Sequence, residues 1–176
     1  MKQFLKICAL IGGTLMLVLL HHVVVDILPY PFELVNLTYT ALLWWLMYNP
    51  NTYLNTLIVT TAFLSELYAT TPFGVVLISM TLGLIATNWM LTNVFTNHSW
   101  YMVFLVGGLS IAFYRIVYVV GAITVASFMH TGSIPNIKII FDIFQEILLS
   151  SILLEIAYII SRLFSKKMNP RYISLS

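Results

Sequence analysis

The 176-residue sequence contains very little charge. Six acidic and eight basic residues make up 8% of the chain, whereas charged residues make up about 25% of a typical soluble domain. So few charged side chains cannot cover a globule of this length in water, and 60% of the residues are hydrophobic. The bases lie mainly at the two chain ends and form no stripe, so we expect the lipid bilayer as partner and no nucleic acid.

The sequence also lacks the usual marks of an enzyme. Cys8 is the single cysteine, which excludes a disulfide framework and a cysteine-based metal or redox motif. No P-loop, dinucleotide-binding glycine pattern or G-x-S-x-G motif is present. His21 and His22 are adjacent and diverge by roughly 100° on a helix, so they cannot both face one metal ion. We therefore expect no catalytic residue, no cofactor, no metal and no enzymatic activity.

Apolar segments separated by polar or proline-containing turns fill most of the chain. A helix needs about 20 apolar residues to cross the hydrocarbon layer, and packing or bilayer thinning allows fewer. The sequence predicts one all-α domain over residues 1–176, a bundle of six transmembrane helices. Their expected ranges are 4–25, 34–48, 53–68, 73–91, 100–128 and 137–164. The second and third are short and could instead form one re-entrant hairpin, leaving four crossings.

Basic residues at the chain ends predict the orientation. Lys2 and Lys6 flank the first span, and Lys166, Lys167 and Arg171 follow the last. Because Lys and Arg accumulate on the cytoplasmic side, we expect both termini in the cytoplasm and hence an even number of crossings. The first span continues to residue 25 without a signal-peptide cleavage site, so we expect it to remain as an anchor. The expected location is the plasma membrane of a bacterium.

The charged residues that we single out inside the membrane are Arg115, Glu66, Asp142, Glu146 and Glu155. A charge at mid-membrane costs roughly 2.5 to 3.5 kcal/mol on insertion scales, so each should face the bundle interior or serve a function. Counting about 1.5 Å per residue places Arg115 and Glu146 at the same depth, and we predict that they pair between adjacent antiparallel helices. Asp142 lies one turn from Glu146, whereas Glu155 points to a different face, and Glu66 ends the third span.

The Arg115–Glu146 pair allows two interpretations. It could be a structural pin that orients two helices, or part of a proton or substrate relay. We favour the pin. Gly107 and Gly108, which follow one another in the fifth span, indicate close helix packing.

Three segments resemble the MreD family, the rod shape-determining membrane proteins of bacterial cell-wall elongation. They are Pro31 to Leu34 (PFEL) before a short apolar span, Ala62 to Ala69 (AFLSELYA) followed by Pro72 to Gly74 (PFG), and Asn93 to Ser99 (NVFTNHS) before the fifth span. The resemblance extends over residues 29–115, about half of the chain.

The resemblance implies a non-enzymatic scaffold. MreD proteins bind MreC, a partner with one membrane helix, and through it the cell-wall elongation synthases. The short second and third spans need neighbours, so we expect the corner that joins the third and fourth spans to contact a partner. The candidate contact residues are Glu33, Glu66, Pro72, Phe73 and Gly74.

A second function remains open. The fold expected for this family is similar to that of the substrate-binding subunits of energy-coupling-factor transporters, which are small six-helix proteins that bind vitamins. Those subunits usually engage a coupling subunit through small-residue motifs such as Ala-x-x-x-Ala near the first helix. Here the first helix offers Cys8, Ala9, Gly12 and Gly13. The alternative function is therefore binding of a small, vitamin-type solute.

Overall fold

The computed structural model describes residues 2–48, 54–94, 100–128 and 137–164, and these ranges form six α-helices and one short 3-10 helix. The helices are α1 (Lys2–Ile27), η1 (Phe32–Leu34), α2 (Leu37–Tyr48), α3 (Leu54–Leu67), α4 (Val75–Asn93), α5 (Trp100–Phe128) and α6 (Ile137–Phe164). The all-α class expected from the sequence is confirmed.

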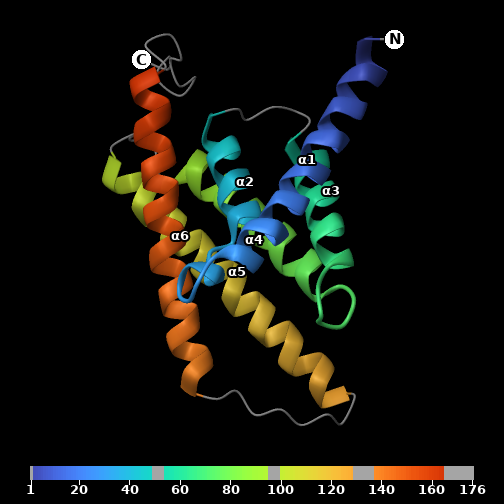
Figure 1. Cartoon of the computed structure of the whole chain (residues 1–176), viewed down its shortest axis with the longest axis vertical. Helices are drawn as coiled ribbons and strands as arrows, with labels where there is room; N and C mark the ends of the chain where they lie inside the picture. Colours follow the sequence, from blue (N-terminus) through green and yellow to red (C-terminus); the bar gives the residue numbers. More distant parts are fainter. Residues whose placement is uncertain (1, 49–53, 95–99, 129–136, 165–176) are drawn as a thin grey trace.

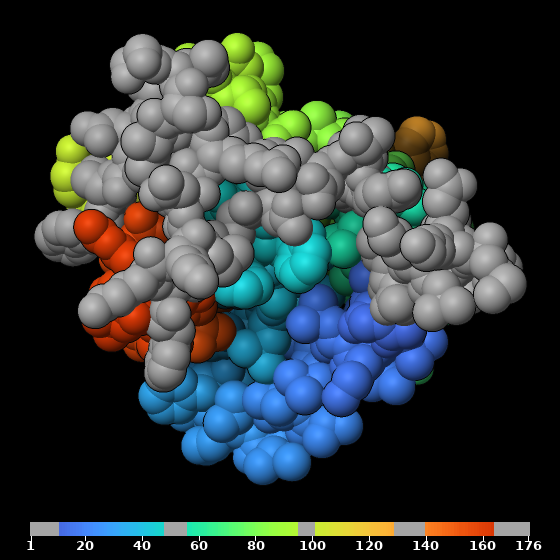
Figure 2. Space-filling view, turned by 90° about the horizontal axis from the view of Figure 1, so that it is seen from above, coloured from blue at the N-terminus to red at the C-terminus, as the bar shows by residue number. Residues whose placement is uncertain are grey.

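Successive α-helices run in alternating directions, so that α1 begins and α6 ends at the same end of the molecule (Figure 1). The helix α2 is central and contacts each of the other α-helices. Seen from the end at which α6 finishes, α1 and α6 lie on either side of α2 (Figure 2). Among the other helices, α1 packs against α3, α3 against α4, α4 against α5 and α5 against α6.

Among the residues that the structure describes, three helices are long and apolar enough to cross a membrane: the segments Val75–Asn93, Tyr101–Phe128 and Ile140–Leu163. This combination of length and composition is typical of a multi-pass membrane protein. The helices α2 and α3 have 12 and 14 residues, or about 18 and 21 Å, and are shorter than the hydrocarbon layer of about 30 Å.

Two helices begin later than the sequence predicted. The second span was expected to begin at Leu34, but residues 32–34 form the 3-10 helix and α2 begins at Leu37, where the Asn36 side chain accepts a hydrogen bond from the Tyr39 backbone N–H (3.0 Å). The fourth was expected from Phe73, but Gly74 has a φ of 102° and precedes the helix, which begins at Val75. A left-handed residue of this kind cannot continue a right-handed helix.

Glycine allows the closest helix contacts in the core. A Cβ atom on Gly83 of α4 would lie 2.5 Å from the Tyr39 hydroxyl of α2, and one on Gly107 of α5 would lie 2.6 Å from Leu154 of α6. Both distances are too short for real atoms. Close packing at Gly107 therefore agrees with the expectation from the sequence.

Candidate functional site

The helices α5 and α6 are joined by the ion pair that the sequence predicted. The Arg115 Nε–H group donates to the Glu146 carboxylate, whose side chain is 2% exposed, while that of Arg115 is 23% exposed. The Arg115 guanidinium also lies over the rings of Tyr114 and Tyr118, at 5.5 and 5.3 Å from their centroids. The two aromatic faces add cation–π attraction to the charge pair. This arrangement fixes the two helices at one register.

A second polar network, which the sequence reasoning missed, continues from the ion pair into the bundle. The Tyr39 ring of α2 stacks on Tyr114, with 4.7 Å between centroids, and its hydroxyl donates to the Ser110 carbonyl (3.2 Å). The Ser110 hydroxyl shares hydrogen bonds with those of Tyr39 (2.8 Å) and of Thr87 on α4. Ser110 and Tyr114 lie four residues apart, so their i, i+4 spacing was a usable signal for one polar face. The network joins three helices.

The Glu66 carboxylate caps a helix inside the protein. The side chain is 4% exposed and accepts hydrogen bonds from the backbone N–H groups of Gly74 (2.8 Å) and Leu77 (2.5 Å) at the beginning of α4. These N–H groups have no partner within the helix, and the positive end of the helix dipole favours a carboxylate there. Glu66 therefore holds the α3–α4 corner together from within.

The other residues of the expected contact corner differ in exposure. Phe73 is 72% exposed, whereas Pro72 and Gly74 are half-buried. Glu33 is exposed on the 3-10 helix η1, which contacts α1 and α6 and is not part of the α3–α4 corner. Of these five candidates, Phe73 and Glu33 are the two that present an exposed side chain.

Asp142 lies where the chain between α1 and η1 touches α6. The Tyr30 hydroxyl is within hydrogen-bond distance of the Asp142 carboxylate (3.3 Å) and of Gln145 Oε1 (2.7 Å). Desolvation, followed by the charge of Asp142, raises the pKa of Tyr30. Asp142 thus attaches a loop to the helix that also carries Glu146.

Glu155 differs from the other two acids of α6, Asp142 and Glu146. Both of its carboxyl oxygens are buried, and neither has a hydrogen-bond partner in the described part of the chain. The sequence had placed this residue on a different face from Glu146, and the structure leaves the two acids nine residues apart with different surroundings. Its charge is uncompensated within these helices.

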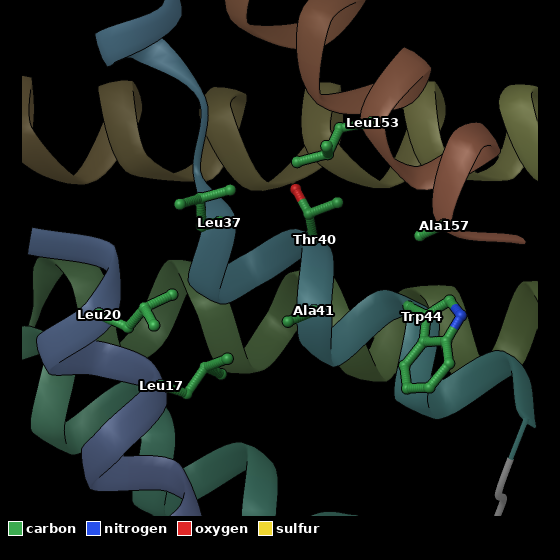
Figure 3. A pocket seen from close by; sticks show the side chains of 8 residues that line it. All are labelled: Leu17, Leu20, Leu37, Thr40, Ala41, Trp44, Leu153 and Ala157. Atoms are coloured by element: carbon green, nitrogen blue, oxygen red, sulfur yellow. The ribbon is translucent and has the colours of Figure 1, made fainter. Parts of the chain in front are cut away.

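A cavity of about 300 Å³ lies between α1, α2 and α6 (Figure 3). Its lining residues are Leu17, Leu20, Leu37, Thr40, Ala41, Trp44, Leu153 and Ala157. The two polar groups among them are engaged elsewhere: the Thr40 hydroxyl donates to the Asn36 carbonyl (2.7 Å), and the Trp44 indole N–H donates to Ser161 (2.9 Å). The cavity wall therefore offers hydrocarbon to any occupant.

Within the residues that the structure describes, no three His, Cys, Asp or Glu side chains come together in a way that could hold a metal ion. Three of the acids instead contact other groups: Glu146 meets an arginine, Asp142 a tyrosine hydroxyl and Glu66 backbone N–H groups.

Comparison with models of protein families, with curated proteins and with solved structures finds no match for this chain.

Proposed function

We propose that this protein is a non-enzymatic membrane scaffold of bacterial cell-wall elongation, which binds an MreC-like single-span protein and, through it, the elongation synthases. The observation that supports this proposal most directly is that polar side chains within the helices bind one another. Arg115 with Glu146, and Tyr39 with Ser110, join one helix to another. Polar side chains that bind one another in this way hold the helices in fixed positions and are not free to act on a substrate. Both properties suit a scaffold.

The finer topology belongs to the same proposal. Six crossings with both termini in the cytoplasm agree with the alternating helix directions and with the basic residues at both chain ends (Figure 1). The short helices α2 and α3 lie against longer neighbours, which reduces the lipid-facing length that each must provide.

Cysteine labelling tests the topology. The variant Cys8→Ala removes the native thiol, and Asn49→Cys then places one thiol between the second and third helices. With six crossings, an impermeant maleimide reaches this thiol from the cytoplasmic side. Labelling from the outside would instead support a re-entrant hairpin and four crossings.

Solute binding is the alternative function, and the size of the cavity favours it, because small-molecule sites begin at about 300 Å³. Its lining argues against a vitamin-type ligand. Such a ligand needs a few converging polar groups for orientation, yet Thr40 and Trp44 already donate to the protein itself. Polar groups of the ligand would lose their hydrogen bonds to water and gain none. The scaffold is therefore the function that the site supports better.

Affinity purification from native membranes tests the scaffold. The expected result is recovery of a protein with one membrane helix, a coiled coil and a β-rich domain. A tagged, unrelated multi-pass protein from the same membranes controls for non-specific capture. Recovery of an ATPase pair in place of the single-span protein would contradict the scaffold and favour the transporter subunit.

A further inference from the structure

Glu155 occupies a position in α6 at which a carboxyl group needs a partner. It lies about 5 Å along the axis from the midpoint of the apolar segment Ile140–Leu163, well within the length that would cross the hydrocarbon. Neither carboxyl oxygen has a hydrogen-bond partner in the described residues. Intramembrane acids are rare, and most pair with another group.

The described bases do not supply that group. Arg115 donates to Glu146, and Arg162 lies seven residues from Glu155, about 10 Å farther along the helix. The cavity between α1, α2 and α6 does not include Glu155 either. Leu153 and Ala157, which line it, each lie roughly 160° around the helix from Glu155. Glu155 therefore lies on the other side of α6 from this cavity.

That side of α6 carries a regular stripe, which we name the outer stripe of α6. Its residues are Phe141, Phe144, Leu148, Ile152, Glu155, Ile159 and Arg162. The steps between them are three or four residues, and six steps over 21 residues average 3.5. This is the repeat of a helix that packs along a second helix in a left-handed pair. All members except Glu155 are exposed.

We propose that the outer stripe of α6 binds a single transmembrane helix of another protein, which carries a hydrogen-bond donor, above all a basic side chain, level with Glu155. The inference rests on the scaffold function and specifies the chemistry of its partner. A carboxyl group in hydrocarbon is complementary to a donor or a positive charge. The five apolar members of the stripe, at 3.5-residue spacing, provide the packing surface.

The other possible occupants complement Glu155 less well. Lipid tails offer the carboxyl group no hydrogen-bond donor. A second copy of the chain, bound through the same stripe about a two-fold axis, would bring two Glu155 carboxyl groups together. A helix with a donor satisfies both the stripe and the acid. The Glu155 side chain as a whole is partly exposed, so it can turn toward a partner by rotating about its own bonds.

Site-specific photocrosslinking of the full chain in native membranes tests this proposal. The probe p-benzoylphenylalanine is placed at position 152 or 159, which flank Glu155 on the stripe. Position 160 is the matched control, because Ile160 is also exposed but lies roughly 140° away from Glu155. We expect crosslinks to one single-span protein from 152 and 159 and at least fivefold fewer from 160.

Variants at Glu155 then link the crosslink to the carboxyl group. Glu155→Leu should lower the crosslink yield at least fivefold, whereas Glu155→Gln should retain much of it, because the amide still accepts a hydrogen bond. Replacing the donor in the crosslinked helix by leucine should lower the yield as much as Glu155→Leu does. Crosslinks to lipid alone, crosslinks to a second copy, or a yield that does not depend on Glu155 would overturn the proposal.

The outcomes separate this inference from the scaffold function. If affinity purification recovers an MreC-like protein whose crosslinks do not depend on Glu155, the scaffold stands and the proposed stripe contact is wrong. If the crosslinks depend on Glu155 but reach a single-span protein of another kind, the stripe contact stands and the assignment to cell-wall elongation is wrong.

Discussion

Two of the three acids of α6, Glu146 and Glu155, lie on different sides of the helix and have different surroundings. On the inner side, Glu146 meets Arg115 and lies beside the tyrosines that connect α5 with α2. On the outer side, Glu155 has no hydrogen-bond partner among the described residues and lies within an apolar stripe. The comparison shows that acids in the same membrane helix can have different roles. One serves the fold, and we propose that the other serves binding.

The largest expected loss of stability comes from breaking the Arg115–Glu146 pair. Glu146→Leu leaves the Arg115 guanidinium without its counter-charge in a half-buried position, and removing one partner of a buried pair costs about 3–5 kcal/mol. Thermal unfolding of the purified protein in detergent measures the loss. The double variant Arg115→Met with Glu146→Leu removes both charges and should recover most of the stability. A Glu146→Leu variant as stable as the wild type would contradict the role of the pair.

The second largest effect is expected at Gly83, which is buried, in comparison with Gly12, which is exposed. In Gly83→Ala the new methyl group would lie 2.5 Å from the Tyr39 hydroxyl, and overpacking of this kind costs about 1–3 kcal/mol. Gly12 on α1 is the matched control, because a Cβ there meets no atom within 4 Å. Gly12→Ala should leave the unfolding temperature unchanged or raise it slightly, because alanine favours the helix more than glycine does. Equal effects at both positions would contradict the close approach of α2 to α4.

Removal of the cap at the α3–α4 corner should have a smaller effect. Glu66→Ala leaves the Gly74 and Leu77 N–H groups without an acceptor, and loss of a helix cap costs about 0.5–2 kcal/mol. Glu66→Gln keeps an acceptor and should lose less. Amide hydrogen exchange at the beginning of α4 checks the location of the effect, since protection should fall there first. Unchanged protection in Glu66→Ala would show that the carboxylate does not cap the helix.

The smallest expected effect on stability belongs to the outer acid. Glu155→Leu removes a carboxyl group that has no partner in the described chain, so the free energy of unfolding should change by less than about 0.5 kcal/mol or increase. The same thermal measurement as for Glu146→Leu makes the two acids directly comparable. A large loss of stability in Glu155→Leu would show that Glu155 holds the fold and would end the contrast between the two sides.

Much of the fold could be predicted from hydrophobic run length. The ranges expected for the fifth and sixth helices coincide with α5 and α6, because apolar runs of 29 and 28 residues leave their ends unambiguous. The beginnings of α2 and α4 were placed too early. Apolar residues continue through the 3-10 turn and through Phe73, and backbone conformation, not hydrophobicity, decides where these helices begin.

The contacts of the site could be predicted where the depth of two residues along their helices is enough to pair them. Arg115 and Glu146 could be matched because each lies within one long continuous helix, so a count of residues gives their level. The role of Glu66 could not be read in this way, since its partners are backbone N–H groups of the next helix and leave no signature in side-chain identity. The Tyr39–Ser110–Thr87 network is similarly hidden, because it depends on three helices meeting at one level.

The central claim is that the inner acid serves the fold and the outer acid serves a partner. The most direct test purifies Glu146→Leu, Arg115→Met with Glu146→Leu, and Glu155→Leu side by side from native membranes, and measures both the unfolding temperature and the amount of single-span partner recovered. We predict that Glu155→Leu keeps its stability and loses its partner, while the double variant regains both relative to Glu146→Leu. A Glu155→Leu variant that keeps its partner, or loses its stability, would contradict the account.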